Sequence, residues 1–279
     1  MRISKAKSLA AMTGVAAVLL VLGAAGAAAQ SIPLAAHRAF YELVLDPSKP
    51  GMKVDGARGR IVYEVTGSAC TGWAITLRQV TELNSGEGKR TVSDLRSTTW
   101  EDGDAKSYRF KTQNFLDQEI REEVDGTLDR AKDGLAVRLT KPKSERLTLQ
   151  GNILLPTEHI RKLLVAAAAG ERTLEAKVFD GSPDGKRIYD TLSVLGAVVA
   201  GDRDLEEASR QPELGTLKRY PVTISYFEPG TGERTPTYVL GFELYENGVS
   251  RALRLDYGSF AMRGELKTIE FLKSTPCKR

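Results

Sequence analysis

Apolar side chains occupy every second position through most of this chain. Residues 59–66 alternate Ile61, Tyr63 and Val65 with polar neighbours, and residues 73–83 repeat the pattern. A period of two places the apolar side chains of a strand on one face of a sheet. The alternation therefore predicts a chain built mainly from β-strands that each bury one face.

About thirteen strands can be placed by this alternation and by the turn residues between them. They are expected at residues 38–45, 59–66, 73–83, 90–101, 107–115, 119–125, 144–149, 173–179, 187–195, 220–227, 237–245, 249–257 and 265–272, with a hairpin over residues 127–140 that turns at Asp133-Gly134. Asn247-Gly248 gives the clearest hairpin turn, because both residues readily adopt the positive φ of a type I′ turn.

One segment follows helical periodicity instead. Leu155-Pro156-Thr157-Glu158 predicts the start of a helix with Thr157 as its N-cap. Apolar residues recur at i, i+3, i+4 and i+7 over residues 160–167, and Gly170 predicts the end of the helix. Residues 201–217 are charged and irregular, with a short helix expected near Leu205.

The order of these elements predicts the fold class. Strands and helices do not alternate, so a parallel sheet is not expected. So many antiparallel strands twist and curl instead of staying flat. We expect an all-β, mainly antiparallel fold in which residues 30–279 form one domain. Its single long sheet would curl toward a barrel or an open half-barrel, with an apolar-lined concave interior and one packed α-helix.

The first thirty residues carry the pattern of a secretory signal peptide. Three cations within the first seven residues precede an uncharged run over residues 8–29, which contains an apolar core at residues 9–22. Small residues at 27–29 supply a cleavage site before Gln30. We expect residues 1–29 to be removed. An uncleaved membrane anchor is the alternative, because the uncharged run is just long enough to cross a bilayer.

Cleavage would remove three positive charges and no negative charge, so the formal net charge would fall from +4 to +1. A net charge near zero gives no electrostatic basis for binding nucleic acid. No later segment is an unbroken apolar stretch of membrane length. The mature protein is therefore expected in the periplasm, with no transmembrane segment after signal cleavage.

The two cysteines, Cys70 and Cys277, both lie in the expected mature chain. In an oxidising compartment two such cysteines are expected to pair. Two free thiols and a redox pair are the alternatives, although a redox pair usually needs Cys-x-x-Cys at a helix N-terminus.

Known catalytic motifs are absent from the sequence. It contains no Gly-x-Ser-x-Gly, no His-Glu-x-x-His and no phosphate-binding loop. No catalytic residue, cofactor or metal site is therefore assigned. Residues 180–185 match the first half of a calcium loop, but Thr191 stands where the bidentate Glu belongs. A polar hairpin loop explains the same residues.

Three side chains are candidates for contact with a cavity or a partner. Trp73 and Trp100 each lie on an expected strand and are interpreted as core or cavity-lining residues. His159 lies at the edge of the apolar stripe of the helix, where a packed or solvent-facing histidine is expected and a catalytic or ligand-sensing role is the alternative. His37 opens the first strand and is expected to be exposed.

A series of short motifs runs from about residue 37 to the C-terminus. They are Gly67-Ser68-Ala69-Cys70-Thr71-Gly72-Trp73, Ser93 to Trp100, Leu155-Pro156-Thr157-Glu158-His159, Phe179-Asp180-Gly181-Ser182, Tyr189-Asp190-Thr191, Glu246-Asn247-Gly248 and Cys277. In this order, with one cysteine early and one near the end, the chain resembles the EipB family of periplasmic cell-envelope integrity proteins, long classed as a domain of unknown function.

The resemblance implies a long antiparallel sheet wound as a β-spiral, similar to the open half-barrels of lipoprotein carriers. It also implies a disulfide between Cys70 and Cys277. Family members are thought to maintain the Gram-negative envelope by binding, with periplasmic tetratricopeptide-repeat proteins as implied partners. The resemblance brings no catalytic residues to this chain.

The favoured hypothesis is a non-enzymatic periplasmic binding protein that supports envelope integrity and stress resistance through a protein partner. The alternative is a carrier of lipid or of lipoprotein acyl chains in the concave interior, where a lipid or peptide ligand would lie. A hydrolase is a third hypothesis, because a fold alone does not exclude an active site.

Overall fold

The computed structural model describes residues 32–49, 51, 54–85, 88–202, 204–230, 235–274 and 277. The chain divides into two compact units, Met1–Gln30 and Ser31–Arg279, and every described residue belongs to the second. The expected signal peptide, residues 1–29, lies outside the described residues. Within the described part, no helix has both the length and the apolar composition needed to span a membrane.

Fifteen strands of the described residues form a single sheet. The first run comprises β1 (His37–Leu45), β2 (Gly56–Ser68), β3 (Gly72–Asn84), β4 (Arg90–Glu101), β5 (Ser107–Leu116), β6 (Glu119–Ala131), β7 (Gly134–Lys141) and β8 (Glu145–Gln150). The second comprises β9 (Ile153–Leu154), β10 (Thr173–Val178), β11 (Tyr189–Leu195), β12 (Arg219–Phe227), β13 (Tyr238–Tyr245), β14 (Ser250–Asp256) and β15 (Ala261–Phe271).

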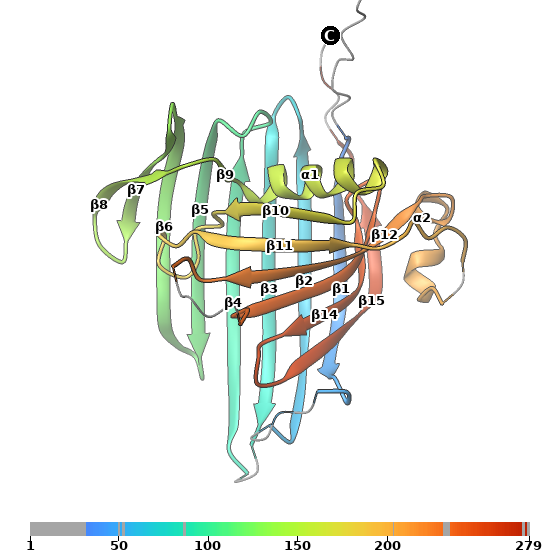
Figure 1. The fold of residues 1–279 in the computed structure, drawn as a ribbon. Coiled ribbons are helices and arrows are strands. Elements are labelled where there is room, and N and C mark those ends of the chain that lie inside the picture. The colour runs from blue at the N-terminus through green and yellow to red at the C-terminus, as the bar shows by residue number, and fades with distance from the viewer. Residues whose placement is uncertain are drawn as a thin grey trace, which may run out of the picture. The chain divides into compact units, whose positions relative to one another are not determined.

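The two runs join where β1 pairs with β15, over a register from His37↔Phe271 to Leu45↔Met262. Figure 1 shows β1–β6 standing upright behind β10–β14, which run across them. The sheet therefore folds back over itself into a nearly closed, barrel-like structure with β8 and β9 as its two edges. The expected all-β, mainly antiparallel, curled sheet with one packed helix is confirmed.

Alternating burial explains why these residues form strands. Along β1, His37, Ala39, Tyr41 and Leu43 are buried while the residues between them are more exposed. We call the sheet face that carries these four side chains the inner face. The strand positions expected from the period of two agree closely with those observed, although β15 begins earlier, at Ala261.

Three apolar clusters hold the curled sheet together. The first joins β1 and β2 to β14 and β15, with Tyr41 and Met262 fully buried in it. The second packs β5–β7 against residues 153–155 and Phe179, so it fastens the region of β8 to the region of β9. The third packs the single long helix against β11–β13. Burial of this apolar surface is the main force that closes the sheet.

The inner face also carries polar side chains beside the apolar clusters. Polar side chains share it on β3–β5: the Gln79 amide donates to Thr81 Oγ1 and to Tyr257 Oη, at 3.1 and 2.9 Å. Ser97 and Thr112 hydroxyl oxygens lie 3.3 Å apart on neighbouring strands. The interior is lined by the three apolar clusters together with these polar side chains, because alternation identifies the inward positions but does not fill all of them with apolar residues.

The long helix is α1 (Pro156–Ala168). Its N-cap is Leu155, not Thr157 as the sequence suggested, and the Leu155 amide donates to the Glu158 carboxylate at 3.3 Å. Gly170 follows the helix with φ +80°, the left-handed conformation expected where a helix ends. Leu163 and Leu164 are fully buried in the third cluster, so the predicted apolar stripe does pack against the sheet.

One strand pair departs from the antiparallel pattern. The two-residue strand β9 leads into α1, and α1 leads back to β10, which pairs with β9 in parallel. The sequence predicted a mainly antiparallel sheet, and one parallel pair of two residues at its edge agrees with that prediction. A strand of two residues is too short to show any periodicity in the sequence.

Residues 201–217 contain the 3₁₀ helix η1 (Glu207–Arg210) and the one-turn helix α2 (Pro212–Gly215), just after the position predicted near Leu205. A buried guanidinium fastens this segment: Arg251 pairs with Glu206 and, at 2.5 Å, with Glu243. Arg251 also donates to the Asp204 carbonyl at 2.7 Å. The segment is thereby held against β13 and β14.

Candidate functional site

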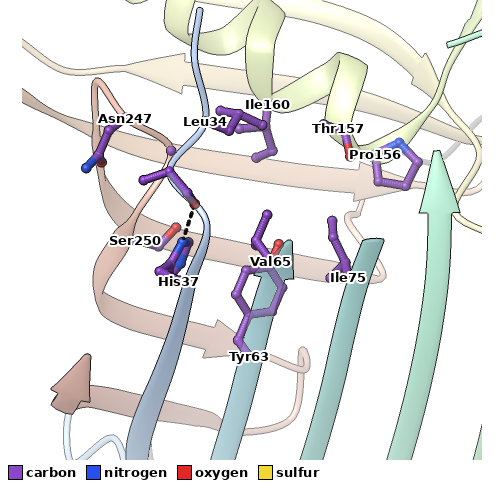
Figure 2. Close-up of a pocket in the computed structure, with 12 residues that line it drawn as sticks. Leu34, His37, Tyr63, Val65, Ile75, Pro156, Thr157, Ile160, Asn247 and Ser250 are labelled. Carbon is purple, nitrogen blue, oxygen red and sulfur yellow. Dashed lines mark hydrogen bonds between the residues drawn. The ribbon is translucent and has the colours of Figure 1, made fainter. Parts of the chain in front are cut away.

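A pocket of about 80 Å³ lies beneath the N-terminal half of α1 (Figure 2). Parts of the chain that are distant in sequence meet there: the segment leading into β1, the end of β2 with the start of β3, the start of α1, and the β13–β14 hairpin. Apolar side chains form most of its wall, with Leu34, Val65, Ile75 and Ile160 pointing into the same space. The pocket is therefore a small, mostly apolar enclosure covered by a helix.

The hairpin and the segment before β1 fix one side of the pocket. The Ala35 amide donates to the Asn247 carbonyl at 2.8 Å. Gly248 has φ +86°, and a side chain there would bring its Cβ within 2.6 Å of Leu34 Cδ2. The turn that the sequence predicted at Asn247-Gly248 thus places the hairpin directly against Leu34.

A buried carboxylate fixes the opposite side. Glu101, at the end of β4, is 3% exposed and accepts hydrogen bonds from the Thr157 and Glu158 amides at 2.7 and 2.8 Å. These amides belong to the first turn of α1 and have no partner inside the helix. Burial raises the pKa of the Glu101 carboxyl to about 7, although the two amide hydrogen bonds oppose the shift.

Two arginines strengthen the same attachment. Arg130 donates to the carbonyls of Ala105 and Ile153, at 2.9 and 3.0 Å, and to Glu158 at 2.8 Å. Arg161 donates to the Gly103 carbonyl at 3.0 Å. The start of α1 is therefore held to the β4–β5 turn by several hydrogen bonds, which keeps the helix in place over the pocket.

His37 is the polar group of the pocket with an unused bonding position. It is 1% exposed, so the expectation that it is exposed was wrong. Its Nδ1 lies 2.8 Å from the Ala35 carbonyl oxygen, and its buried Nε2 has no hydrogen-bond partner in the described part of the chain. Desolvation lowers the pKa of the imidazole, so the ring is neutral at pH 7.

The two cysteines are bonded to each other, as expected. Cys70 and Cys277 have their Cα atoms 5.6 Å apart across a sequence separation of 207. Cys70 lies in the turn between β2 and β3, and the Trp100 indole donates to the Thr71 carbonyl of that turn at 3.2 Å. The bond therefore ties the C-terminal tail to the end of the sheet where α1 and the pocket lie.

None of the three predicted contact residues lines this pocket. Trp73 is buried in the protein, as a core residue would be. Trp100 is half-buried, with the Arg109 guanidinium 5.1 Å from the centre of its ring. His159 is 3% exposed, and burial together with Lys162 lowers its pKa to about 4. His159 is thus a packed helix residue, and a contact of these side chains with a partner stays a prediction.

The loop at residues 180–185 uses its carboxylates to form its own turns. Asp180 accepts hydrogen bonds from the amide and the hydroxyl of Ser182, both at 2.9 Å. Asp184 accepts from the Lys186 and Arg187 amides at 2.8 and 3.0 Å. Across the described residues, no three or more His, Cys, Asp and Glu side chains form a group suited to a metal ion. The geometry favours the hairpin-loop interpretation over a calcium loop.

A second, wider groove of about 1080 Å³ runs along β10 and β11. Charged side chains border it, and Lys177 pairs with Asp190 across the two strands at 2.7 Å. Apolar side chains also line it, including Leu192 and Phe227. A wide, open groove of mixed polarity is more typical of a protein-contact surface than of an enclosed ligand site.

The sequence contained a sign that His37 points inward, but nothing in it indicated that Glu101 binds the start of α1. His37 falls in the buried register of β1, two residues before Ala39, which marks it as an inward position. Glu101 meets α1 only through the fold, more than fifty residues along the chain. Local patterns cannot reveal such a contact.

Comparison with known proteins agrees with this architecture. Residues 28–273 match the model of a family described as EipB-like. The chain is 37% identical over 265 residues, 94% of both chains, to a protein named Cell envelope integrity protein EipB from Brucella abortus (strain 2308). The crystal structure of a beta-barrel-like protein of a domain of unknown function from Brucella abortus superposes with a TM-score of 0.80 and 36% identity, covering 86% of this chain and 99% of that one.

Proposed function

The chain belongs to the EipB-like family, and from this premise we propose that it acts in the periplasm to support cell-envelope integrity by binding a protein partner. The observation that carries the proposal is the similarity over nearly the whole chain to a protein named for envelope integrity. The similarity includes both the sheet and the region of α1. A shared role is therefore a simpler explanation of it than a shared fold with unrelated functions.

Binding is the mechanism that the geometry supports best. The pocket beneath α1 is enclosed by elements that hydrogen bonds, an ion pair and the disulfide hold in place. Sites held rigidly in advance lose less conformational entropy when a partner binds. Glu246, in the β13–β14 hairpin, is exposed and precedes Asn247 and Gly248 of the pocket wall, so we expect the partner to approach from this side.

The alternative of a lipid or acyl carrier has less support. Pockets for drug-sized ligands enclose on the order of 300 to 1,000 Å³, whereas the pocket beneath α1 holds about 80 Å³. The wide groove along β10 and β11 is large enough, but Lys162, Lys177 and Asp190 border it. Charged groups beside an acyl chain would lose hydration at a cost that the chain cannot offset.

Deleting the gene tests the proposed role. We expect the deletion strain to become sensitive to detergents and to cell-wall antibiotics, because an integrity protein matters most under envelope stress. Expression of the full chain should restore resistance, whereas a version lacking residues 1–29 should remain in the cytoplasm and fail to do so. A deletion strain that tolerates both treatments like the parent would overturn the proposal.

A further inference from the structure

The strand β8 is an open edge of the sheet. It is the last strand in the sheet order, so β7 is its only strand neighbour among the described residues, and Figure 1 shows it at the outer left. Edge strands are usually protected by shortness, a bulge, proline or charge, because an open edge can pair with another chain. β8 pairs six residues with β7 without a register shift, and residues 147–150 contain neither proline nor charge. The opposite edge, β9, has only two residues.

The register of β8 shows which of its backbone groups point away from the sheet. The Gly151 amide donates to the Asp133 carbonyl at 3.0 Å, and these two residues continue the β7–β8 register. In an antiparallel pair, residues that bond to each other alternate with residues whose amides and carbonyls point to the other side. Odd-numbered residues of β8 therefore bond to β7. The even-numbered residues, all exposed, direct their backbone groups to the open side; they are Arg146, Thr148 and Gln150.

The inward side chains of β8 indicate what kind of strand would pair there. Leu147 and Leu149 pack, partly buried, against the second apolar cluster. Their neighbours on β7, Val137 and Leu135, are fully buried in that cluster. Burial decreases at β8 because it is the last strand of the sheet. A further strand with apolar residues at its inward positions would cover both leucines.

The outward side chains carry an unbalanced positive charge. Arg146 lies directly opposite Arg138 of β7. Arg138 pairs with Asp129 at 3.4 Å, whereas no acidic side chain of the described residues pairs with Arg146. Like charges that face each other across two strands destabilise a sheet, and opposite charges stabilise it. An acidic residue that faces Arg146 from an added strand would therefore supply the missing partner.

We propose that β8 is a docking edge, where an extended segment of a protein partner adds a further strand to the sheet. The segment pairs in antiparallel orientation, the more stable of the two. It has apolar residues at alternate positions, which cover Leu147 and Leu149, and an acidic residue opposite Arg146. The source of the segment rests on the proposed function in binding a partner, whereas the pairing itself does not.

Amide hydrogen exchange, followed by NMR on the purified protein, tests the pairing. The probe is the peptide acetyl-Thr-Val-Thr-Val-Glu-Thr-amide, whose glutamate falls opposite Arg146 in the antiparallel register. When the peptide occupies about nine-tenths of the protein, the amides of residues 146, 148 and 150 should exchange about tenfold more slowly. The amides of Leu147 and Leu149 already bond to β7, so they are the internal control and should be unchanged.

Two further peptides separate backbone pairing from charge attraction. N-methylation at the second threonine and at the glutamate keeps all side chains but removes two donors, so this peptide should not slow exchange. A peptide with lysine in place of the glutamate should protect the same amides more weakly, because it faces Arg146 with a like charge. If the first peptide protects none of the outward amides, or if the N-methylated peptide protects them equally well, the proposal is overturned.

The protein without peptide tests the other occupants of the edge. If the amides of residues 146, 148 and 150 are protected at every protein concentration, the chain covers its own edge. If their protection rises with protein concentration, a second copy pairs there. Either result would overturn the assignment of the edge to a partner segment.

Substitutions in β8 connect the edge to the role in the cell. The Thr148 amide points away from β7, so Thr148→Pro removes an outward donor without breaking a bond inside the sheet, and Thr148→Val keeps that donor. We expect Thr148→Pro, but not Thr148→Val, to lose peptide protection at Arg146 and Gln150 and to fail to restore detergent resistance to the deletion strain. A Thr148→Pro protein that melts like Thr148→Val and keeps either property would contradict the proposal.

A charge reversal gives a second test that does not depend on proline. Arg146→Glu should reverse the preference, so that the lysine peptide protects the edge better than the glutamate peptide. An unchanged preference would overturn the assigned register. Failure of the peptides would refute the docking edge and leave the envelope role intact, whereas a deletion strain without a phenotype would refute the envelope role and leave the peptide results intact.

Discussion

The buried carboxylate of Glu101 makes the stability of this protein depend on pH in a way that one substitution can isolate. Its pKa is about 7 in the folded protein and 4.5 as the reference value. The folded state therefore binds this proton more tightly, and stability falls as pH rises between these two values. The difference of pKa corresponds to about 3 kcal/mol. The Glu101→Gln variant cannot ionise, so it should lack this loss.

Urea denaturation of both proteins between pH 4.5 and 8 measures the effect. We expect the stability of Glu101→Gln relative to the native protein to rise by about 3 kcal/mol across this interval. Burial lowers the pKa of His159 to about 4, so protonation of this imidazole lowers the stability of the protein as pH falls. This effect is the same in both proteins and cancels in the difference. Parallel stability curves for the two proteins would refute the assignment of the raised pKa to Glu101.

Three further predictions concern the framework around the pocket. Cys70→Ser should lower the free energy of unfolding by about 5 kcal/mol, which is the chain-entropy value for so long a loop. Cys277→Ser should have the same effect, because it breaks the same disulfide. Native protein that melts at the same temperature with and without dithiothreitol would contradict this prediction. Arg251→Met should destabilise the protein by about 3 kcal/mol because it leaves the largely buried Glu206 carboxylate without its guanidinium, whereas Glu243 keeps its pair with Arg219. The same variant should speed proteolysis within residues 201–217. Lys267→Met, which breaks more exposed pairs, should change stability by less than about 1 kcal/mol, and equal effects of the two variants in urea titrations would argue against the buried pair. Gly103→Ala should lower the melting temperature because its new methyl group would collide with the Ala69 carbonyl oxygen. Gly215→Ala is the control, because a methyl group there meets open space and should leave the melting temperature nearly unchanged. Similar melting temperatures for the two variants would show that the turns near Cys70 can move to accommodate the methyl group.

Strands were predictable from this sequence because burial of one face imposes a period of two. Residues 90–101 were predicted with the same bounds as β4, and the Asn247-Gly248 turn forms where its residues favour it. The short strand β9 was missed because two residues carry no period. The start of α1 was misplaced by two residues because its first amides are satisfied by Glu101, a partner from another strand.

The pocket itself could not be predicted, because it assembles residues separated by more than two hundred positions. Leu34 reaches Gly248 only after β1 has paired with β15 and the sheet has closed. His37 was misjudged for the same reason: its register was inward, but the cover over it comes from α1 and the distant hairpin. The disulfide was easier to anticipate, since two cysteines in a chain that is expected to be exported have one possible intramolecular pairing.

Crosslinking in the periplasm tests the central claim most directly. A photo-crosslinking residue at Glu246, beside the pocket, should capture a discrete protein partner, while the same residue at Val62, exposed on β2, should not. Lipid extraction of the same purified samples should yield no stoichiometric lipid. Stoichiometric lipid without a protein adduct at Glu246 would contradict the partner-binding account and favour a carrier.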